Sequence, residues 1–426
     1  MFVLKVLAMG ISFLYVPLLL NVMNSYNYGL WLTITSLASW ISLLDIGLGN
    51  GLRNKLSESL AKNNDSLGRS YVSTAYTFIT ISACIVICIF LFINPVIPWG
   101  RVLGVVDIEN DYLQKLVAIV VVAIGIQFCL NLINSILYAL QLPAITSLII
   151  FLGQLFSFVF VYIAVNYFHI TSLLYLVAII ATTPVLVLLI SSFIIFRIKY
   201  KRIAPSIKYI KKRYIKDILT LGIKFLFIQI STIVLYQTNN LLITNILGPD
   251  HVSEYHLVFK YIFVVYTIFA IIITPIWSAT TDAFARNDIK WIKMTIRHVY
   301  IIFYIACLGL IFMVLLSPYM YKFWIGDKST MLNMSTTIIM AIYAVSQMLY
   351  GIYGYIINGI GKMYISVLMN ILLSIAYIPI AYYLICNIGI PGALLAQILI
   401  NIIMYIVSKI QSHKLLTGTA SGIWNR

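Results

Sequence analysis

Twelve apolar windows of helical length constrain the fold of this chain more than any other sequence feature. A helix that crosses a bilayer needs about 20 mainly apolar residues, and each window is close to that length or longer. Turn-forming residues such as Asn24–Asn27, Gly248–Asp250 and Gly389–Pro391 separate the windows. The pattern predicts an all-α membrane protein whose spans cover residues 4–23, 30–50, 71–97, 114–140, 144–167, 172–196, 218–247, 255–278, 299–324, 332–358, 363–386 and 391–409.

The composition agrees with a membrane protein. Apolar residues make up 62% of the chain and charged residues only 9%, whereas soluble domains carry about 25% charged residues. A water-soluble enzyme is therefore excluded. The net charge of +16 does not indicate a nucleic-acid partner, because membrane proteins collect Lys and Arg in their cytoplasmic loops.

The distribution of basic residues predicts the orientation. With the N-terminus in the cytoplasm, 22 of the 28 Lys and Arg residues fall in cytoplasmic segments and 4 in external ones. Only Lys224 and Lys260 lie inside spans. The positive-inside rule thus predicts that both termini are cytoplasmic. The first window continues past Pro17 without a small-residue cleavage pattern, so we expect a span and not a cleaved signal peptide.

The chain divides into two halves of six spans. Each half carries a similar motif in the basic loop after its second span, Ala61–Asp65 in one and Ala285–Asp288 in the other. Six spans per half give both halves the same orientation, so we expect a parallel repeat. The predicted parts are an N-terminal six-helix bundle, a basic linker, a C-terminal six-helix bundle and a cytoplasmic tail, at residues 1–196, 197–217, 218–409 and 410–426.

The linker has an amphipathic pattern. Ile203, Ile207, Ile210, Tyr214 and Ile218 recur at helical spacing, with Lys and Arg on the other face. This pattern predicts a helix lying on the inner leaflet. Two roles remain open: an anchor that joins the halves, or a surface that recruits an anionic headgroup.

No motif for catalysis, nucleotide binding or metal binding is present. The glycine-rich run Gly47–Leu52 lacks the third glycine and the preceding strand of a dinucleotide fingerprint. The five cysteines lie in apolar segments without neighbouring ligands, so we expect them to be core residues. We expect no enzyme activity, no cofactor and no metal.

Ionisable residues in or beside the spans are the candidates for a binding site, since each is costly in hydrocarbon. They are Asp45, Arg53, Lys224 and Lys260. The lysines could extend to the interface, and Asp45 could pair with Arg53 or Lys55. If they line one cavity instead, Arg53, Lys224 and Lys260 suit an anionic headgroup such as a diphosphate, and Asp45 suits gating or ion coupling.

Amides inside the spans form a second group of candidates. Asn131, Asn134, Gln237 and Asn240 are the members that we assign to a polar cavity. Such amides often serve only as hydrogen bonds between helices. In a wet cavity they would offer partners to the hydroxyl groups of a sugar.

One stretch resembles a known family. It runs from Tyr28–Ile34 through Ser39-Trp40 to Asp45–Lys55, and the similarity continues at Ala61–Asn63, Tyr71–Thr74, Pro275–Ser278 and Asp282-Ala283. The chain resembles the Wzx-type O-antigen and polysaccharide-unit flippases of the multidrug/oligosaccharidyl-lipid/polysaccharide exporter superfamily. Spans 9–12 depart from that family, because they contain almost none of the charged residues that its members commonly carry there.

The resemblance implies a V-shaped pair of six-helix bundles around a cationic central cavity. It implies a monomer in the bacterial inner membrane that moves undecaprenyl-diphosphate-linked oligosaccharides from the inner to the outer leaflet by alternating access. Membrane lipids, a polysaccharide polymerase and chain-length machinery are the implied partners. The alternatives are a multidrug exporter of the same superfamily and a membrane-embedded glycan transferase or polymerase. Short external loops and missing catalytic clusters count against the enzyme.

Overall fold

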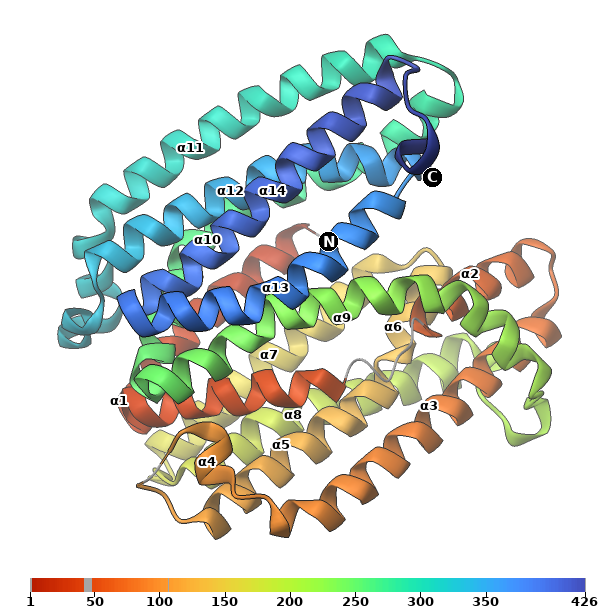
Figure 1. The fold of residues 1–426 in the computed structure, drawn as a ribbon. Coiled ribbons are helices and arrows are strands. Elements are labelled where there is room, and N and C mark those ends of the chain that lie inside the picture. Colours follow the sequence, from red (N-terminus) through yellow and green to blue (C-terminus); the bar gives the residue numbers. More distant parts are fainter. Residues whose placement is uncertain (1, 42–47, 106, 426) are drawn as a thin grey trace. The chain divides into compact units, whose positions relative to one another are not determined.

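The computed structural model describes residues 2–41, 48–105 and 107–425, and at 2, 50, 61, 219–229, 232, 236, 278 and 285 it describes the backbone alone. These residues form helices and connecting turns, with no strand among them (Figure 1). The α-helices are α1 (Phe2–Ala38), α2 (Leu48–Ala61), α3 (Asp65–Ile93), α4 (Trp99–Leu103), α5 (Asn110–Leu130), α6 (Leu132–Ala139), α7 (Pro143–Asn166), α8 (Leu173–Ile194), α9 (Arg213–Leu247), α10 (Pro249–Ala285), α11 (Ile289–Ile325), α12 (Met334–Ile360), α13 (Tyr364–Ile388) and α14 (Ile390–Leu416). Short helices of other types are η2 (Asn94–Val96), η3 (Ile195–Lys199), η4 (Lys201–Ile203), η5 (Ile207–Tyr209), η6 (Gly326–Met331) and η7 (Gly422–Asn425).

The helices agree with the predicted spans. Ten segments of the described chain are long and apolar enough to cross a membrane. The first of them, Val3–Ile41, is interrupted at Asn24, where the backbone leaves the helical region with φ 61° and ψ 174°. It therefore contains the first predicted span and part of the second. Helix α9 overlaps the seventh predicted span, residues 218–247. Together these segments are consistent with twelve spans.

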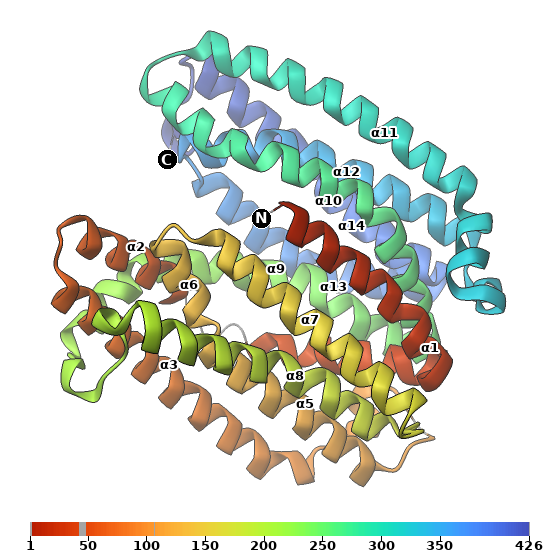
Figure 2. The same cartoon turned by 180° about the vertical axis from the view of Figure 1, so that it is seen from behind.

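The chain forms two compact units, residues 1–233 and 234–426. In unit 1, α7 packs on α1 and α8, and α5 packs on α3 and α8; Figure 2 shows α7, α8 and α5 running along one another. In unit 2, α12 packs on α10, α11 and α14. The linker and the beginning of α9 belong to unit 1.

The turns of the two halves match in order and conformation. Five positive-φ residues separate the successive spans of each half, in the same order. In the first half these residues are Asn24, Asn63, Gly104, Gln141 and His169, and in the second half they are Gly248, Asn287, Gly326, Gly361 and Gly389. The first pair even shares an extended ψ, 174° at Asn24 and 164° at Gly248. This correspondence is consistent with the predicted parallel repeat.

The motif shared by the two loops forms the same turn twice. Asn63 and Asn287 have φ values of 53° and 58°. The next residue begins a helix: the side chain of Asn64 accepts a hydrogen bond from the amide of Leu67, and that of Asp288 accepts one from the amide of Trp291. These are N-caps, which satisfy amides that the helix itself leaves unpaired.

The linker does not form the predicted amphipathic helix. It contains η4 and η5, separated by extended residues, before α9 begins at Arg213. Pro205 lacks an amide hydrogen and disfavours helical geometry at the preceding residue. Side chains of α3 satisfy the backbone instead: the amide of Ser206 donates to Ser73 Oγ and that of Lys211 to Thr74 Oγ1.

The predicted apolar face of the linker is divided as a result. Ile203 and Ile218 are buried in the core of unit 1, whereas Ile207 is 86% exposed. The expectation of core cysteines was largely wrong, because Cys84, Cys88 and Cys386 are exposed on helix sides and Cys129 and Cys307 are only half-buried. A small apolar thiol is as well suited to a position that faces lipid as to a core.

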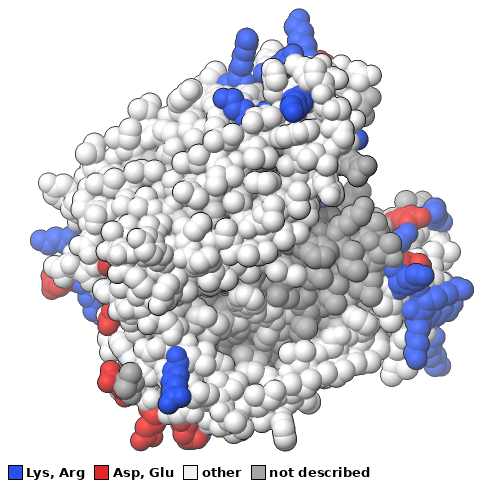
Figure 3. Space-filling view, viewed as in Figure 1, with Lys and Arg blue, Asp and Glu red and all other residues white. Residues whose placement is uncertain are grey.

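Charge is distributed as a membrane requires. On the face that Figure 3 draws, Lys and Arg gather toward the edges of the molecule, where helices of Figure 1 end, and the described helix sides between them carry almost no charge. Those sides are apolar and exposed, as Ile301, Ile305 and Leu308 of α11 show. The chain is therefore a multi-pass membrane protein.

Candidate functional site

Arg53 lies on α2 and stacks on α6. Leu48, Leu52 and Leu56 form the fully buried face of α2 and join the core cluster that includes Leu132 and Ile136 of α6. This packing places the exposed Arg53 beside α6, with its guanidinium 5.1 Å from the ring centroid of Tyr138. No carboxylate among the described residues pairs with Arg53. Asp45 lies outside the described residues, so its pairing with Arg53 stays a prediction.

The glycine run before Arg53 permits a close approach of two helices. A Cβ at Gly51 would lie 2.4 Å from the carbonyl oxygen of Ile218 on α9. Only a residue without a side chain fits there, because neither backbone can move away cheaply. Gly51 of the glycine-rich run thus has a packing role, while Gly47 lies outside the described residues.

Asn131 and Asn134 share a helix face, as predicted. Asn131 lies between α5 and α6, and its Oδ1 accepts a hydrogen bond of 3.1 Å from Asn134 Nδ2. The Oδ1 atom of Asn134 is buried and has no partner among the described residues. Tyr138, the ring beneath Arg53, follows Asn134 by one helical turn. The α2–α6 pair therefore collects a cation, an aromatic ring and two amides within unit 1.

Lys260 lies in unit 2 on α10 and is half-buried. His256 lies one turn before it on the same helix. No Asp or Glu of the described chain is within 4.0 Å of its ammonium group. Lys224 is part of α9, but its side chain lies outside the described residues.

The structure identifies a buried carboxylate that the sequence analysis missed. Glu254 of α10 is only 4% exposed. Its Oε1 accepts hydrogen bonds from Thr336 Oγ1 at 2.8 Å and from the amide of Asn333 at 3.1 Å. Glu254 therefore caps the start of α12, where a negative charge is favoured by the helix dipole. It escaped notice because it lies one residue before the predicted span 255–278.

The amides of α9 divide into two groups. Asn239 is fully buried and connects three helices, because it donates to Tyr255 Oη and accepts from Tyr377 Oη. Gln237 and Asn240 are half-buried on the same helix. Asn239 therefore joins helices through hydrogen bonds. The assignment of Gln237 and Asn240 to a cavity stays a prediction.

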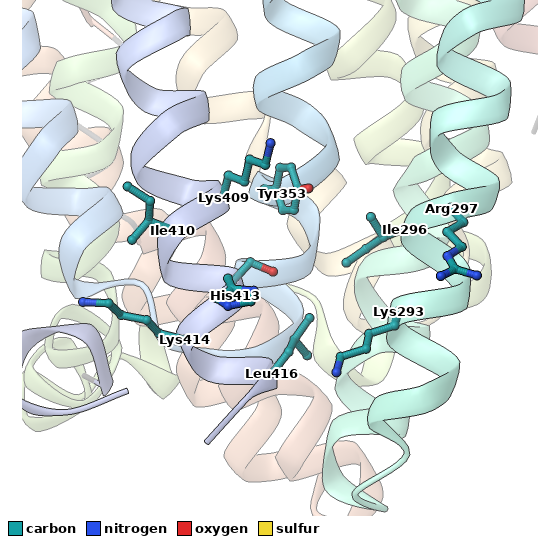
Figure 4. Close-up of a pocket in the computed structure, with 10 residues that line it drawn as sticks. Lys293, Ile296, Arg297, Tyr353, Lys409, Ile410, His413, Lys414 and Leu416 are labelled. Carbon is teal, nitrogen blue, oxygen red and sulfur yellow. The ribbon is translucent and has the colours of Figure 1, made fainter. Parts of the chain in front are cut away.

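A distinct pocket lies within unit 2, between α11, α12 and the end of α14. Its volume is about 570 Å³. Figure 4 shows Lys293 extending from α11 toward the end of α14. The basic lining residues are Lys293, Arg297, Lys409, His413 and Lys414, and the others are Ile296, Tyr353, Ile410, Ser412 and Leu416. We name this the basic pocket.

The basic pocket was missed because its lysines and arginine resemble ordinary cytoplasmic charge. The sequence signal that could have revealed it is helical spacing: Lys293 and Arg297 are one turn apart, and so are Lys409 and His413. That the two pairs meet follows only from the packing of α11 and α14 on α12. Among the described residues no cluster of His, Cys, Asp or Glu could hold a metal ion.

Comparison with known proteins gives the family. A family model described as polysaccharide biosynthesis protein matches residues 1–281. The chain is 23% identical over 328 residues to the "Putative O-antigen transporter" of Salmonella typhi, across 75% of this chain and 72% of that protein. A protein of the same name from Salmonella typhimurium is also 23% identical, across 68% of this chain and 65% of its own length.

Solved structures give the fold. The chain is similar to an inward-facing multidrug resistance MATE family transporter of the MOP superfamily, with TM-score 0.75, 15% identity and coverage of 98% of this chain and 99% of that one. A MOP superfamily transporter from Pyrococcus furiosus has TM-score 0.61 and 15% identity, with 97% and 96% coverage. The chain therefore belongs to the polysaccharide biosynthesis protein family and has the fold of the MOP transporters.

Proposed function

We propose that this protein is a flippase that moves lipid-linked O-antigen or polysaccharide units across the bacterial cytoplasmic membrane. The match of residues 1–281 to the polysaccharide biosynthesis family carries the proposal. The similarity to proteins named as O-antigen transporters and the transporter fold support it. The units would be linked to undecaprenyl diphosphate and would pass from the inner to the outer leaflet by alternating access.

The proposed substrate contacts follow from charge. Arg53, Lys224 and Lys260 would hold the diphosphate or acidic sugars, because phosphate binds preferentially to Lys and Arg. Asp45 would act in gating or ion coupling, and Asn131, Asn134, Gln237 and Asn240 would contact sugar hydroxyls. The unpaired Oδ1 of Asn134 supports this role for its pair, since a buried acceptor without a partner is costly.

The cellular test is deletion of the gene in its own host. We expect undecaprenyl-linked units to accumulate on the cytoplasmic side and surface polysaccharide to disappear. Complementation with Lys260→Ala should restore about tenfold less transport, since hydrogen bonds to charged groups contribute about 1.5–3 kcal/mol. Lys115→Ala is the control, because Lys115 makes an exposed ion pair with Asp111. Normal surface polysaccharide in the deletion strain would contradict the proposal.

A multidrug exporter is the second candidate, because the similar solved structures include multidrug transporters. An exporter of cationic drugs would prefer carboxylates in its cavity, because opposite charges attract. In unit 2 the buried carboxylate Glu254 is already bonded to the start of α12. The half-buried Lys260 would repel a cation. Unchanged drug resistance in the deletion strain would separate the two functions.

A further inference from the structure

The basic residues that line the pocket of unit 2 have no acidic partner among the residues that the structure describes. None of the described residues that line it carries a carboxylate. Elsewhere the described cations Lys62, Lys115 and Arg286 each have an acidic partner one helical turn away. None of the ion pairs in the described chain involves Lys293, Arg297, Lys409 or Lys414.

The corresponding position in unit 1 is covered. Counted from the N-caps Asn64 and Asp288, Arg69 corresponds to Lys293 and Ser73 to Arg297. The linker lies over this part of α3, because Arg69 Nε donates to the carbonyl of Ala204 at 2.9 Å and Ser73 Oγ accepts from the amide of Ser206. The guanidinium of Arg69 is also 4.5 Å from the ring centroid of Tyr209.

In the described part of unit 2, no hydrogen bond joins the corresponding part of α11 to the segment after the last span. The segment that follows its last span turns toward α13 and α14 instead. Trp424 of this segment lies beneath Lys414, with the ammonium 4.2 Å from the ring centroid, and its carbonyl accepts from Gln411 of α14. Lys293 and Arg297 consequently remain exposed beside the pocket.

The inner end of the pocket supplies hydroxyl donors. Tyr353 lines the pocket and belongs to a cluster in which Tyr300 Oη is 3.3 Å from Tyr353 Oη and 3.1 Å from Tyr405 Oη. Lys409 lies above Tyr405, with its ammonium 5.6 Å from the ring centroid. Ammonium, guanidinium and phenol groups together are the donors that bind phosphate oxygens.

The surroundings favour a phosphate attached to a lipid over one free in solution. Ile296 and Ile410 line the pocket. One turn beyond Arg297, the side of α11 becomes apolar and exposed, with Ile301 56%, Ile305 63% and Leu308 67% exposed. An acyl or prenyl chain can lie along this side while its headgroup enters the pocket. A volume of about 570 Å³ is large enough for a headgroup.

We propose that the basic pocket binds the phosphate headgroup of a membrane lipid at the cytoplasmic ends of α11 and α14. The lipid is either the polyprenyl diphosphate carrier of the substrate or an anionic phospholipid. The first source rests on the proposed function, and there the pocket captures the carrier before transport. The second source does not rest on it.

Lipid binding to the purified full-length protein tests the proposal directly. Native mass spectrometry in neutral detergent would measure the affinity for undecaprenyl diphosphate, phosphatidylglycerol and inorganic pyrophosphate separately. The double variant Lys293→Gln with Arg297→Gln should weaken binding of the lipid phosphate about tenfold or more, since it removes two charged donors that would bind phosphate oxygens. Lys409→Gln, on another helix, should weaken it less but measurably.

Lys290→Gln is the matched control, because Lys290 is an exposed cation of α11 that does not line the pocket. It should change the affinity less than about twofold. Tighter binding of undecaprenyl diphosphate than of phosphatidylglycerol would identify the carrier as the ligand, and the reverse would identify a phospholipid. If the double variant, Lys409→Gln and the control all bound the lipid with equal affinity, the basic pocket would not be the binding site. If inorganic pyrophosphate bound as tightly as the lipids, the proposal that the ligand is a lipid would be wrong. Because no transport is measured, these outcomes are independent of the flippase proposal.

Discussion

The starts of α3 and α11 follow the same turn but present opposite surfaces. Asn63-Asn64 and Asn287-Asp288 have matching backbone conformations and matching N-caps. In unit 1 the linker then covers Arg69, whereas in unit 2 the corresponding Lys293 lines an open basic pocket. The difference teaches that the same position of a repeated fold can be covered by the chain itself in one copy and left open in the other.

The second difference precedes the same turn. Counted back from the N-caps, Gly51 of α2 corresponds to Pro275 of α10. In unit 1 a glycine permits contact with α9, whereas in unit 2 the proline lies inside one continuous helix. A Pro inside a helix removes one backbone hydrogen bond and bends the helix. The two units therefore differ at this position, with a close helix contact in unit 1 and an internal proline in unit 2.

Gly51→Ala should produce the largest loss of stability among the changes that probe this comparison. Its Cβ would lie 2.4 Å from the carbonyl oxygen of Ile218, so α2 and α9 must separate. We expect about 1–3 kcal/mol of destabilisation, typical of overpacking, measured as a lower melting temperature in detergent.

Gly10→Ala is the control for that change, since nothing lies within 4 Å of its Cβ position. It should be neutral or stabilise by up to about 1 kcal/mol, because Ala has the higher helix propensity. If the two variants had equal melting temperatures, the close approach of α2 and α9 at Gly51 would be contradicted.

The turns between the last two spans of each half allow a second test. Gly389 has φ 69° and ψ −146°, a region that only glycine adopts easily. His169 has φ 52° at the corresponding turn. Gly389→Ala should cost about 1–3 kcal/mol, whereas His169→Gly should cost little. Thermal unfolding of both variants measures the difference, and a greater loss for His169→Gly would contradict the matching of the turns.

The hydrogen bonds that hold the linker of unit 1 on α3 can be removed by substitution. Ser73→Ala with Thr74→Val removes the acceptors for the amides of Ser206 and Lys211. Each lost bond should cost about 1 kcal/mol. Trypsin should then cleave the linker at its Lys and Arg residues faster than in the parent protein.

Thr77→Val is the control for the cover, because its hydroxyl donates within α3 to the carbonyl of Ser73. Cleavage in the control should match the parent. If the double variant were also cleaved at the parental rate, the linker would not be held to α3 by these bonds.

The smallest expected effect is on the pH dependence of stability, through Glu58 near the turn of unit 1. Hydrogen bonds from Lys62 and Lys55 lower the pKa of Glu58 below its usual value. A lowered carboxyl pKa gives stability that is present above the pKa of the unfolded chain and is lost as pH falls through the folded pKa. Glu58→Gln should therefore flatten the acid side of the melting-temperature profile slightly. High salt should remove the difference, because the pair is exposed; an unchanged profile would show that it contributes nothing.

Much of the fold could be predicted from the sequence, because hydropathy and turn residues determine spans directly. The repeat was visible in the motif at Ala61 and Ala285, and the turns agree with it. The prediction of a helical linker was wrong. Helical periodicity does not reveal that Pro205 breaks the helix, or that Ser73 and Thr74 accept hydrogen bonds from the linker amides instead.

The candidate site was less predictable than the fold. The Asn131–Asn134 bond follows from spacing along one helix. The stacking of Arg53 on Tyr138 depends on how α2 packs on α6, and the basic pocket depends on α11 and α14 meeting at α12. Such tertiary contacts are not encoded in the periodicity of any single helix.

The transport of a lipid-linked oligosaccharide by the purified protein is the most direct test of the proposed function. The protein would be reconstituted in vesicles with an undecaprenyl-diphosphate-linked oligosaccharide in both leaflets, and an external glycosidase or lectin would report the accessible fraction over time. We predict that the protein makes the inner pool accessible, and that Lys260→Ala slows this exchange while Lys115→Ala does not. An inner pool that stays as protected as in protein-free vesicles would contradict the flippase function.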